Sequence, residues 1–143
     1  MYKKILVALE NGDADRRLLP HVGELARQMG AELILLHVAD GWAARNFEQL
    51  KLAESAEMKA DSEYLENTAV ELRANGLRVA AMLALGNPPN EIVKIAAESG
   101  CDLIALASHG HKLIGDIVHG STIDKVRHNT SVPLLVISAK KTA

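Results

Sequence analysis

The sequence predicts an α/β fold: a five-stranded, mostly parallel, doubly wound sheet with helices on both faces. Five short apolar runs punctuate the chain, and none alternates cleanly with polar residues, which is typical of strands buried on both faces. The runs are residues 5–9, 33–38, 79–85, 103–107 and 133–137. Segments of helical composition separate them, so each strand is expected to reach the next through a right-handed helical crossover.

The ends of the helical segments support the same topology. Gly30, Gly76 and Gly100 each lie shortly before an apolar run, and Asn129 holds the same place before the last run. Helices often end in a left-handed residue, a conformation that glycine adopts without steric cost and asparagine more readily than most residues. Four such helix ends predict a βαβαβαβαβ chain.

Each helical segment also has an apolar stripe that a sheet could bury. Residues 14–29 carry apolar side chains at spacings of three and four, as an amphipathic helix does. They are Leu18, Leu19, Val22, Leu25, Ala26 and Met29. The segment from about 45 to 75 is long and acidic, with Leu65, Ala69 and Leu72 as its stripe. Residues 88–99 open on two prolines and continue with Ile92, Ile95 and Ala96, as a proline-initiated helix does.

Composition limits the classes of function. A chain of 143 residues fits a single domain, which we place at residues 1–143. A net charge of −2 and the scarcity of aromatic residues disfavour nucleic acid as a partner. The single cysteine, Cys101, excludes an internal disulfide and suits a reducing compartment. No apolar stretch is long enough to insert into a membrane, so we expect a cytoplasmic protein.

Residues 107–122, ASHGHKLIGDIVHGST, are rich in glycine and in small polar side chains and follow the fourth predicted strand. In doubly wound sheets, ligands bind beyond the carboxyl ends of the strands. We expect Gly120, Ser121 and Thr122 to begin the last helix, with Ser121 as its N-cap. Free amides there favour an anion such as phosphate. The alternative is that these glycines only form a tight turn and a helix cap.

Standard nucleotide motifs do not decide between these readings. Gly110 and Gly115 have the glycine spacing of a P-loop, but Asp116-Ile117 stands where lysine and a hydroxyl residue are required. The first predicted strand is not followed by the glycine pattern of dinucleotide-binding folds.

Four stretches of the sequence resemble one family over nearly the full chain: MYKKILVALENGD, AELILLHVAD, GNPPNEIVKIAAESGCDLIALASHG and GSTIDKVRHNTSVPLLVI. They are similar to the opening strand and acidic turn, the second strand, the third helix with the fourth strand, and the ending of universal stress proteins. The resemblance implies an adenine nucleotide alpha hydrolase-like fold and a stress-response module that binds ATP together with Mg²⁺.

The resemblance also implies the site residues. The family's G-x2-G-x9-G-[ST] motif, which wraps ribose and phosphates, falls here on Ala107, Gly110, Gly120 and Ser121. The implied adenine and ribose pocket is formed by Ala8, Leu9, Glu10, Val38 and Leu106, and Thr122 is expected to add an N–H at the phosphates. Two positions depart from the family pattern. Ala107 replaces the first glycine, and Glu10 replaces an aspartate.

The resemblance further implies a homodimer through the C-terminal strand, Val132 to Ser138. An apolar edge strand without a partner is prone to aggregation, which supports the same expectation. A monomer whose edge is shielded by charged side chains is the alternative.

Histidines and serines give no clear catalytic or metal site. His109, His111, His119 and His128 cluster in sequence, but no third metal ligand is defined, so no metal site is predicted. We expect His37 to be a hydrogen-bonded structural residue. No nucleophile elbow surrounds Ser108 or Ser121, so no catalytic residue and no enzyme activity is predicted. Two alternatives to the ATP-binding module stay open: a nucleotide-free dimeric regulatory protein of the same family, and a slow ATP hydrolase.

Overall fold

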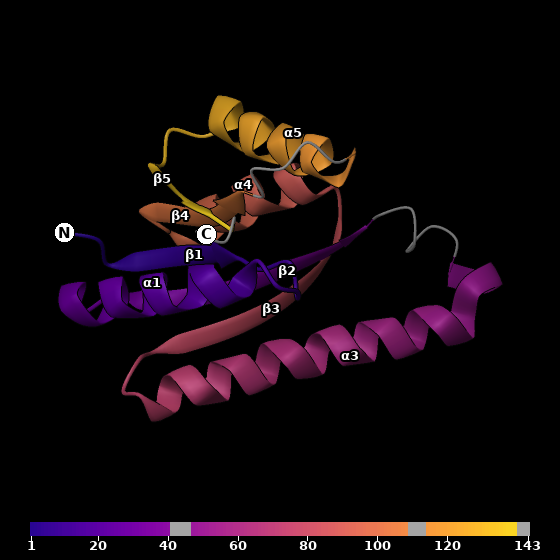
Figure 1. The fold of residues 1–143 in the computed structure, drawn as a ribbon, viewed down its shortest axis with the longest axis horizontal. Helices are drawn as coiled ribbons and strands as arrows, with labels where there is room; N and C mark the ends of the chain where they lie inside the picture. Colours follow the sequence, from indigo (N-terminus) through magenta and orange to yellow (C-terminus); the bar gives the residue numbers. More distant parts are fainter. Residues whose placement is uncertain (41–46, 109–113, 140–143) are drawn as a thin grey trace.

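The computed structural model describes residues 1–40, 47–108 and 114–139, apart from the side chains of residues 40, 47–55 and 114–121 (Figure 1). Helices and strands alternate along the chain: β1 Lys4–Ala8, α1 Asp15–Met29, β2 Glu32–Asp40, α3 Phe47–Ala74, β3 Val79–Gly86, α4 Pro88–Ser99, β4 Leu103–Ser108, α5 Ile114–Asn129 and β5 Leu134–Ser138. The five strands pair in parallel in the order β3-β2-β1-β4-β5. The predicted fold class is confirmed.

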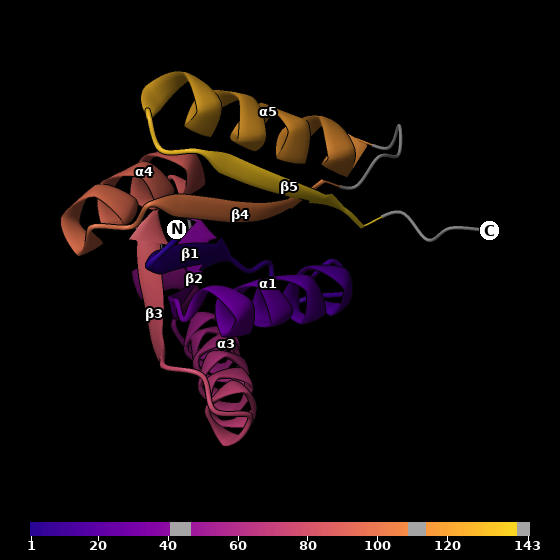
Figure 2. The same cartoon turned by 90° about the vertical axis from the view of Figure 1, so that its left-hand side faces the viewer.

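The sheet lies between two helical layers. Figure 2 shows α1 and α3 on one face and α4 and α5 on the other. Successive residues of the central strand point to opposite layers, as a pleated strand requires. Ile5 and Val7 belong to the apolar cluster with α1 and α3, whereas Leu6 belongs to the cluster with α4 and α5. All three side chains are 0% exposed. Because both faces of the strand are buried, its sequence is a continuous apolar run.

Three of the four predicted left-handed helix ends are confirmed. Gly30, Gly76 and Gly100 have φ angles of 67°, 90° and 71°. The prediction for Asn129 is wrong, because Asn129 is the last helical residue of α5 and has no positive φ. Its side-chain amide instead donates a 2.7 Å hydrogen bond to the Lys125 carbonyl oxygen, a local contact that stabilises the end of the helix.

The predicted apolar stripes face the sheet, with one exception. Leu18, Val22 and Ala26 of α1 are fully buried, as are Leu65 and Ala69 of α3 to within 2%. Ile92, Ile95 and Ala96 of α4 are buried as well. Met29 is 40% exposed, contrary to the prediction, because α1 ends there and Ala31 enters the core in its place.

The start of α5 differs from the prediction. The helix begins at Ile114, so Gly120, Ser121 and Thr122 lie inside it rather than at its N-terminus. A glycine in a helix interior costs only about 1 kcal/mol relative to alanine, which packing can offset. Val126, on the same helix, is 0% exposed in the core. Ser121 is therefore not an N-cap in this structure.

The order of the strands identifies where a ligand would bind. From β1 the chain moves outward to β2 and β3, then returns to the other side of β1 as β4. The connections after β1 and β4 therefore leave in opposite directions, and such a switch point opens a crevice beyond the carboxyl ends of the strands. Within the described part of the chain, none of the helices is long and apolar enough to cross a membrane.

Candidate functional site

A cavity of about 240 Å³ lies beyond the carboxyl ends of β1, β2 and β4, next to α4 and α5. Its walls are formed by Ala8, Leu9, Glu10, Leu36, His37, Val38, Pro88, Ile92, Leu106, Ala107, Thr122 and Ile123. Most of these side chains are apolar, with Glu10, His37 and Thr122 as the polar members. An apolar pocket with a few polar groups is the usual form of a small-molecule site.

The structure brings most of the predicted site residues together at this cavity. The predicted residues that line it are Ala8, Leu9, Glu10, Val38, Leu106, Ala107 and Thr122. Gly110 lies outside the described residues. Gly120 and Ser121 are within α5, where backbone amides already donate to carbonyl groups one turn earlier. The expectation that their amides are free at a helix start is therefore wrong.

Five lining residues were not predicted: Leu36, His37, Pro88, Ile92 and Ile123. Ile92 was expected only as part of the core, since its periodicity in α4 is the same for a core residue and for a pocket wall. His37 was expected to have a structural role. Alternate residues of a strand point to the same face of the sheet, so Leu36 lies on the same face as Val38. The prediction of Val38 at the switch point could therefore have been extended to Leu36.

Ala107 fits its position without strain. It belongs to β4, and Asn11 is the one described non-glycine residue with a positive φ. Ala107 is 6% exposed and belongs to the apolar cluster on the α1 and α3 side of the sheet. The replacement of the family's glycine by alanine at this position therefore leaves a cavity in place.

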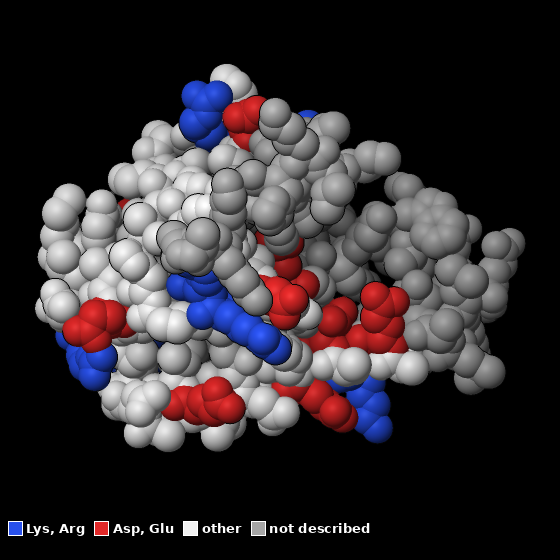
Figure 3. Space-filling view, in the orientation of Figure 1, with Lys and Arg blue, Asp and Glu red and all other residues white. Residues whose placement is uncertain are grey.

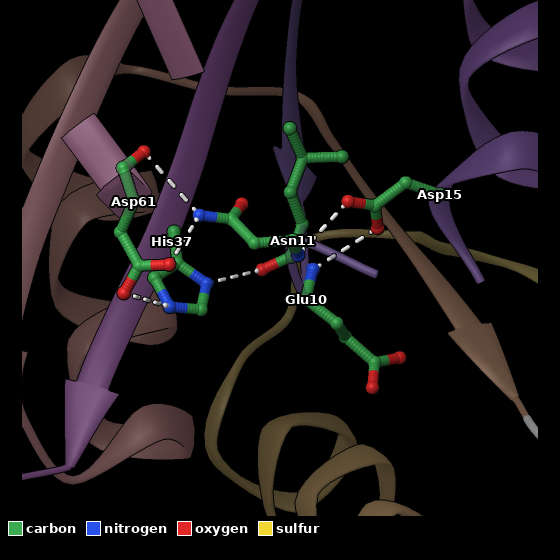
Figure 4. Close-up of polar contacts among 6 residues, drawn as sticks. Glu10, Asn11, Asp15, His37 and Asp61 are labelled. Atoms are coloured by element: carbon green, nitrogen blue, oxygen red, sulfur yellow. Dashed lines mark hydrogen bonds and ion pairs between the residues drawn. The ribbon is translucent and has the colours of Figure 1, made fainter. Parts of the chain in front are cut away.

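The turn between β1 and α1 is held by a buried carboxylate. The Asp15 carboxylate, 1% exposed, accepts hydrogen bonds from the backbone N–H of Glu10 at 3.0 Å and of Asn11 at 2.9 Å (Figure 4). The Tyr64 hydroxyl donates a third at 2.9 Å. Burial raises the pKa of Asp15, although these hydrogen bonds oppose the rise. Burial and the Asp15 carboxylate likewise raise the pKa of Tyr64.

A second set of contacts connects this turn to β2 and α3. The His37 Nδ1 lies 2.9 Å from the Leu9 carbonyl oxygen, and its Nε2 lies 3.4 Å from the Asp61 carboxylate. The Asn11 side-chain amide donates to Asp61 Oδ1 at 3.0 Å. A carbonyl oxygen only accepts, so Nδ1 carries a proton. The predicted hydrogen-bonded role of His37 is confirmed.

The remaining candidate residues, the other histidines and Cys101, either lie away from the cavity or fall outside the residues that the structure describes. His109 and His111 are outside the described residues, as is the side chain of His119. His128 is in the last turn of α5, where a basic side chain is favourable. Cys101 is buried in the α4 and α5 cluster, and burial raises its pKa to about 11, so it behaves as a small apolar residue.

Comparison with known proteins identifies the family. The profile of the universal stress protein family matches residues 1–138. The chain belongs to this family. Universal stress protein MJ0577 of Methanocaldococcus jannaschii is 33% identical over 162 residues, which cover 98% of this chain and 97% of the relative. Its solved structure has a TM-score of 0.86 at 32% identity and covers 99% of each chain.

Two further solved universal stress proteins contain nucleotides. One is a complex with cAMP, at 18% identity and a TM-score of 0.71, covering 97% of this chain and 98% of the other. The second, from Archaeoglobus fulgidus, is a complex with dAMP, at 24% identity and a TM-score of 0.69, covering 95% and 98%. At these identities the likeness shows the shared fold.

Proposed function

We propose that this universal stress protein is a stress-response module that binds an adenine nucleotide, with ATP as the first candidate, in the cavity beyond β1, β2 and β4. The observation that carries the proposal is the cavity itself. It lies at the switch point of the sheet and is lined by strand-end residues that the family resemblance assigned to adenine and ribose. The relatives with bound cAMP and dAMP support an adenine nucleotide as the ligand class.

The cavity matches the nucleoside part of such a ligand. Its volume of about 240 Å³ is below the roughly 300–1,000 Å³ of pockets that enclose a whole drug-sized ligand. The apolar walls from Leu36, Val38 and Ile92 suit a flat base, and the Glu10 carboxylate is an acceptor for ribose hydroxyls. The phosphates then lie outside the cavity, toward the start of α5, where a helix N-terminus favours an anion.

The family motif keeps Gly110, Gly120 and Ser121 as predicted phosphate residues. Inside α5, Gly120 would contribute space and Ser121 its hydroxyl group rather than free amides. Because a phosphate chain itself supplies oxygen ligands, Mg²⁺ would be held mainly through ATP. The proposed activity is binding. Slow hydrolysis of ATP stays an alternative. A cytoplasmic location of the protein stays a prediction.

We also propose a homodimer through Val132 to Ser138. β5 is an edge strand of the sheet, and Val136 on it is 42% exposed. Pairing of two such edges would satisfy backbone groups and cover this apolar surface. A nucleotide-free dimer is the competing function, and nucleotide binding distinguishes the two.

Native mass spectrometry of the purified protein, followed by calorimetric titration with ATP, AMP and cAMP, tests the proposal. We expect a bound adenine nucleotide or saturable binding. Ala8→Leu adds bulk to the cavity wall and should crowd the bound nucleotide. If this crowding costs about 1–3 kcal/mol, as overpacking does in protein cores, nucleotide affinity falls at least about fivefold. Ala97→Leu, on the exposed side of α4, is the matched control and should bind normally.

Absence of any bound or titrated nucleotide would contradict the proposal and favour the nucleotide-free dimer. Equal affinity in Ala8→Leu and wild type would place the binding site elsewhere. Release of phosphate from ATP well above background would instead support the hydrolase alternative.

A further inference from the structure

The backbone that presents Glu10 to the cavity is held by hydrogen bonds to β2 and to the start of α1. The Leu9 N–H donates to the Leu36 carbonyl oxygen at 2.8 Å, and the Leu9 carbonyl oxygen accepts from His37. The N–H groups of Glu10 and Asn11 both donate to Asp15. These contacts fix the backbone that carries the Glu10 side chain at the cavity. Figure 4 shows it pointing away from Asp15 and His37.

Both side chains that hold this backbone are in turn contacted by α3. Asp61 faces His37 and accepts from Asn11, and Tyr64 donates to Asp15. Asp61 and Tyr64 are three residues apart, so they lie on one face of the helix. α3 thus reaches the β1–α1 turn at two points.

Among the residues whose side chains the structure describes, none of those lining the cavity belongs to α3. The lining residues come from β1 and the residues after it, from β2, α4, β4 and α5. Any effect of Asp61 or Tyr64 on a ligand must therefore pass through His37, Asn11 or Asp15.

We propose that Asp61 and Tyr64 are positioning residues that couple the docking of α3 to nucleotide binding in the cavity. They hold the turn in the conformation that directs Glu10 to the ligand. The inference rests on the proposed function and adds a means of regulation. Linkage is reciprocal, so a bound nucleotide also tightens the docking of α3 at the turn, and a partner that displaces α3 weakens nucleotide binding.

Calorimetric titration of ATP into full-length wild type, Asp61→Ala and Tyr64→Phe tests the inference. Tyr64→Phe removes only the hydroxyl that donates to Asp15, so it preserves the packing of the ring. We expect each variant to bind about five- to tenfold more weakly, at the lower end of typical coupling energies. Two controls on α3 should bind within about twofold of wild type, the scatter expected of uncoupled sites: Glu63→Gln removes an exposed charge, and Leu72→Ala destabilises the helix through packing alone.

Amide exchange separates positioning from a general loss of stability. In the ligand-free protein, Asp61→Ala and Tyr64→Phe should accelerate exchange at Glu10 and Asn11 more than at Leu33 in the core, whereas Leu72→Ala should not single out the turn. If Asp61→Ala does not fold, Tyr64→Phe carries the test.

The outcomes are distinguishable. Wild type that binds no nucleotide overturns the proposed function and this inference together. Wild-type binding with unchanged affinity in Tyr64→Phe and any folded Asp61→Ala overturns the inference alone. Equal weakening in Leu72→Ala also overturns it, because the effect would then follow stability rather than the two contacts.

Discussion

Two carboxylates in this protein have pKa values shifted in opposite directions, and each shift has a geometric cause. Asp15 is 1% exposed, and the effect of burial on its pKa exceeds that of the hydrogen bonds that it accepts. Asp102 accepts from the backbone N–H groups of Lys3 and Lys4 at 2.9 and 3.1 Å. Burial would raise its pKa, but these hydrogen bonds outweigh burial and lower it.

The raised pKa of Asp15 predicts a contribution to stability that is lost as pH rises. Below the unfolded-state pKa of about 4, both states are protonated and the contribution is fully present. As pH rises, Asp15 ionises first in the unfolded state, because its pKa is lower there. This ionisation favours the unfolded state and lowers the free energy of unfolding. The stability advantage of wild type over Asp15→Asn should therefore be largest near pH 3 to 4 and should shrink toward neutral pH, as measured by urea unfolding across pH. An advantage that grows with pH would contradict this assignment.

The lowered pKa of Asp102 predicts the reverse. Its stabilising contribution is present above the unfolded-state pKa of about 4 and is lost as pH falls through the folded-state pKa. The difference in unfolding free energy between wild type and Asp102→Asn should decrease on acidification. The same urea series measures it, and a pH-independent difference would show that the two backbone hydrogen bonds do not favour the charged form.

At the scale of elements, α3 combines a buried stripe with exposed surface. Leu65 is 2% exposed, whereas Val70 on the same helix is 54% exposed. Leu65→Ala should lower the unfolding free energy by about 2–5 kcal/mol through lost packing and the cavity left behind. Val70→Ala, also a truncation to alanine, should change it by less than about 0.5 kcal/mol. Denaturant unfolding of both variants checks the contrast, and similar losses would mean that the helix docks differently.

Strands and most helix ends were predictable from sequence because their signals are local. Buried strands require continuous apolar runs, and Gly30, Gly76 and Gly100 end helices through their own backbone freedom. The start of α5 was missed because Gly120 and Ser121 are typical of helix ends, yet the helix tolerates them in its interior. Asn129 was misjudged since its side chain satisfies a helix carbonyl without a left-handed backbone.

The candidate site was predictable where it consists of strand ends. Ala8, Val38 and Leu106 follow from parallel topology and the family motif together. The contacts of Asp61 and Tyr64 were not predictable, because about 50 residues separate each from its partner in the turn. No spacing rule connects two such segments. Their meeting depends on how α3 packs across the sheet.

At the scale of the whole molecule, surface charge and the exposed edge of the sheet indicate which kinds of partner the protein can bind. The face in Figure 3 carries acidic and basic side chains interspersed, rather than a broad basic surface among its described residues. This face therefore gives no electrostatic argument for a nucleic acid partner. The β5 edge, in contrast, exposes Val136 and supports the proposed dimer.

The proposed dimer predicts that Val136→Lys shifts the protein toward monomer, because a charge at a paired edge opposes strand association. Val70→Lys, a similarly exposed position on α3, should leave the association unchanged. Sedimentation velocity over a range of concentrations measures the shift. A wild type that is monomeric at all concentrations would contradict the dimer.

A nuclear magnetic resonance titration of the labelled protein with ATP tests the central claim most directly. The account predicts amide shift changes concentrated at Ala8, Glu10, Val38 and Thr122, which surround the cavity. Absence of changes at saturating ATP would contradict it. So would changes confined to the hollow between α1 and the end of α3, which is lined by Gly23 and Leu72.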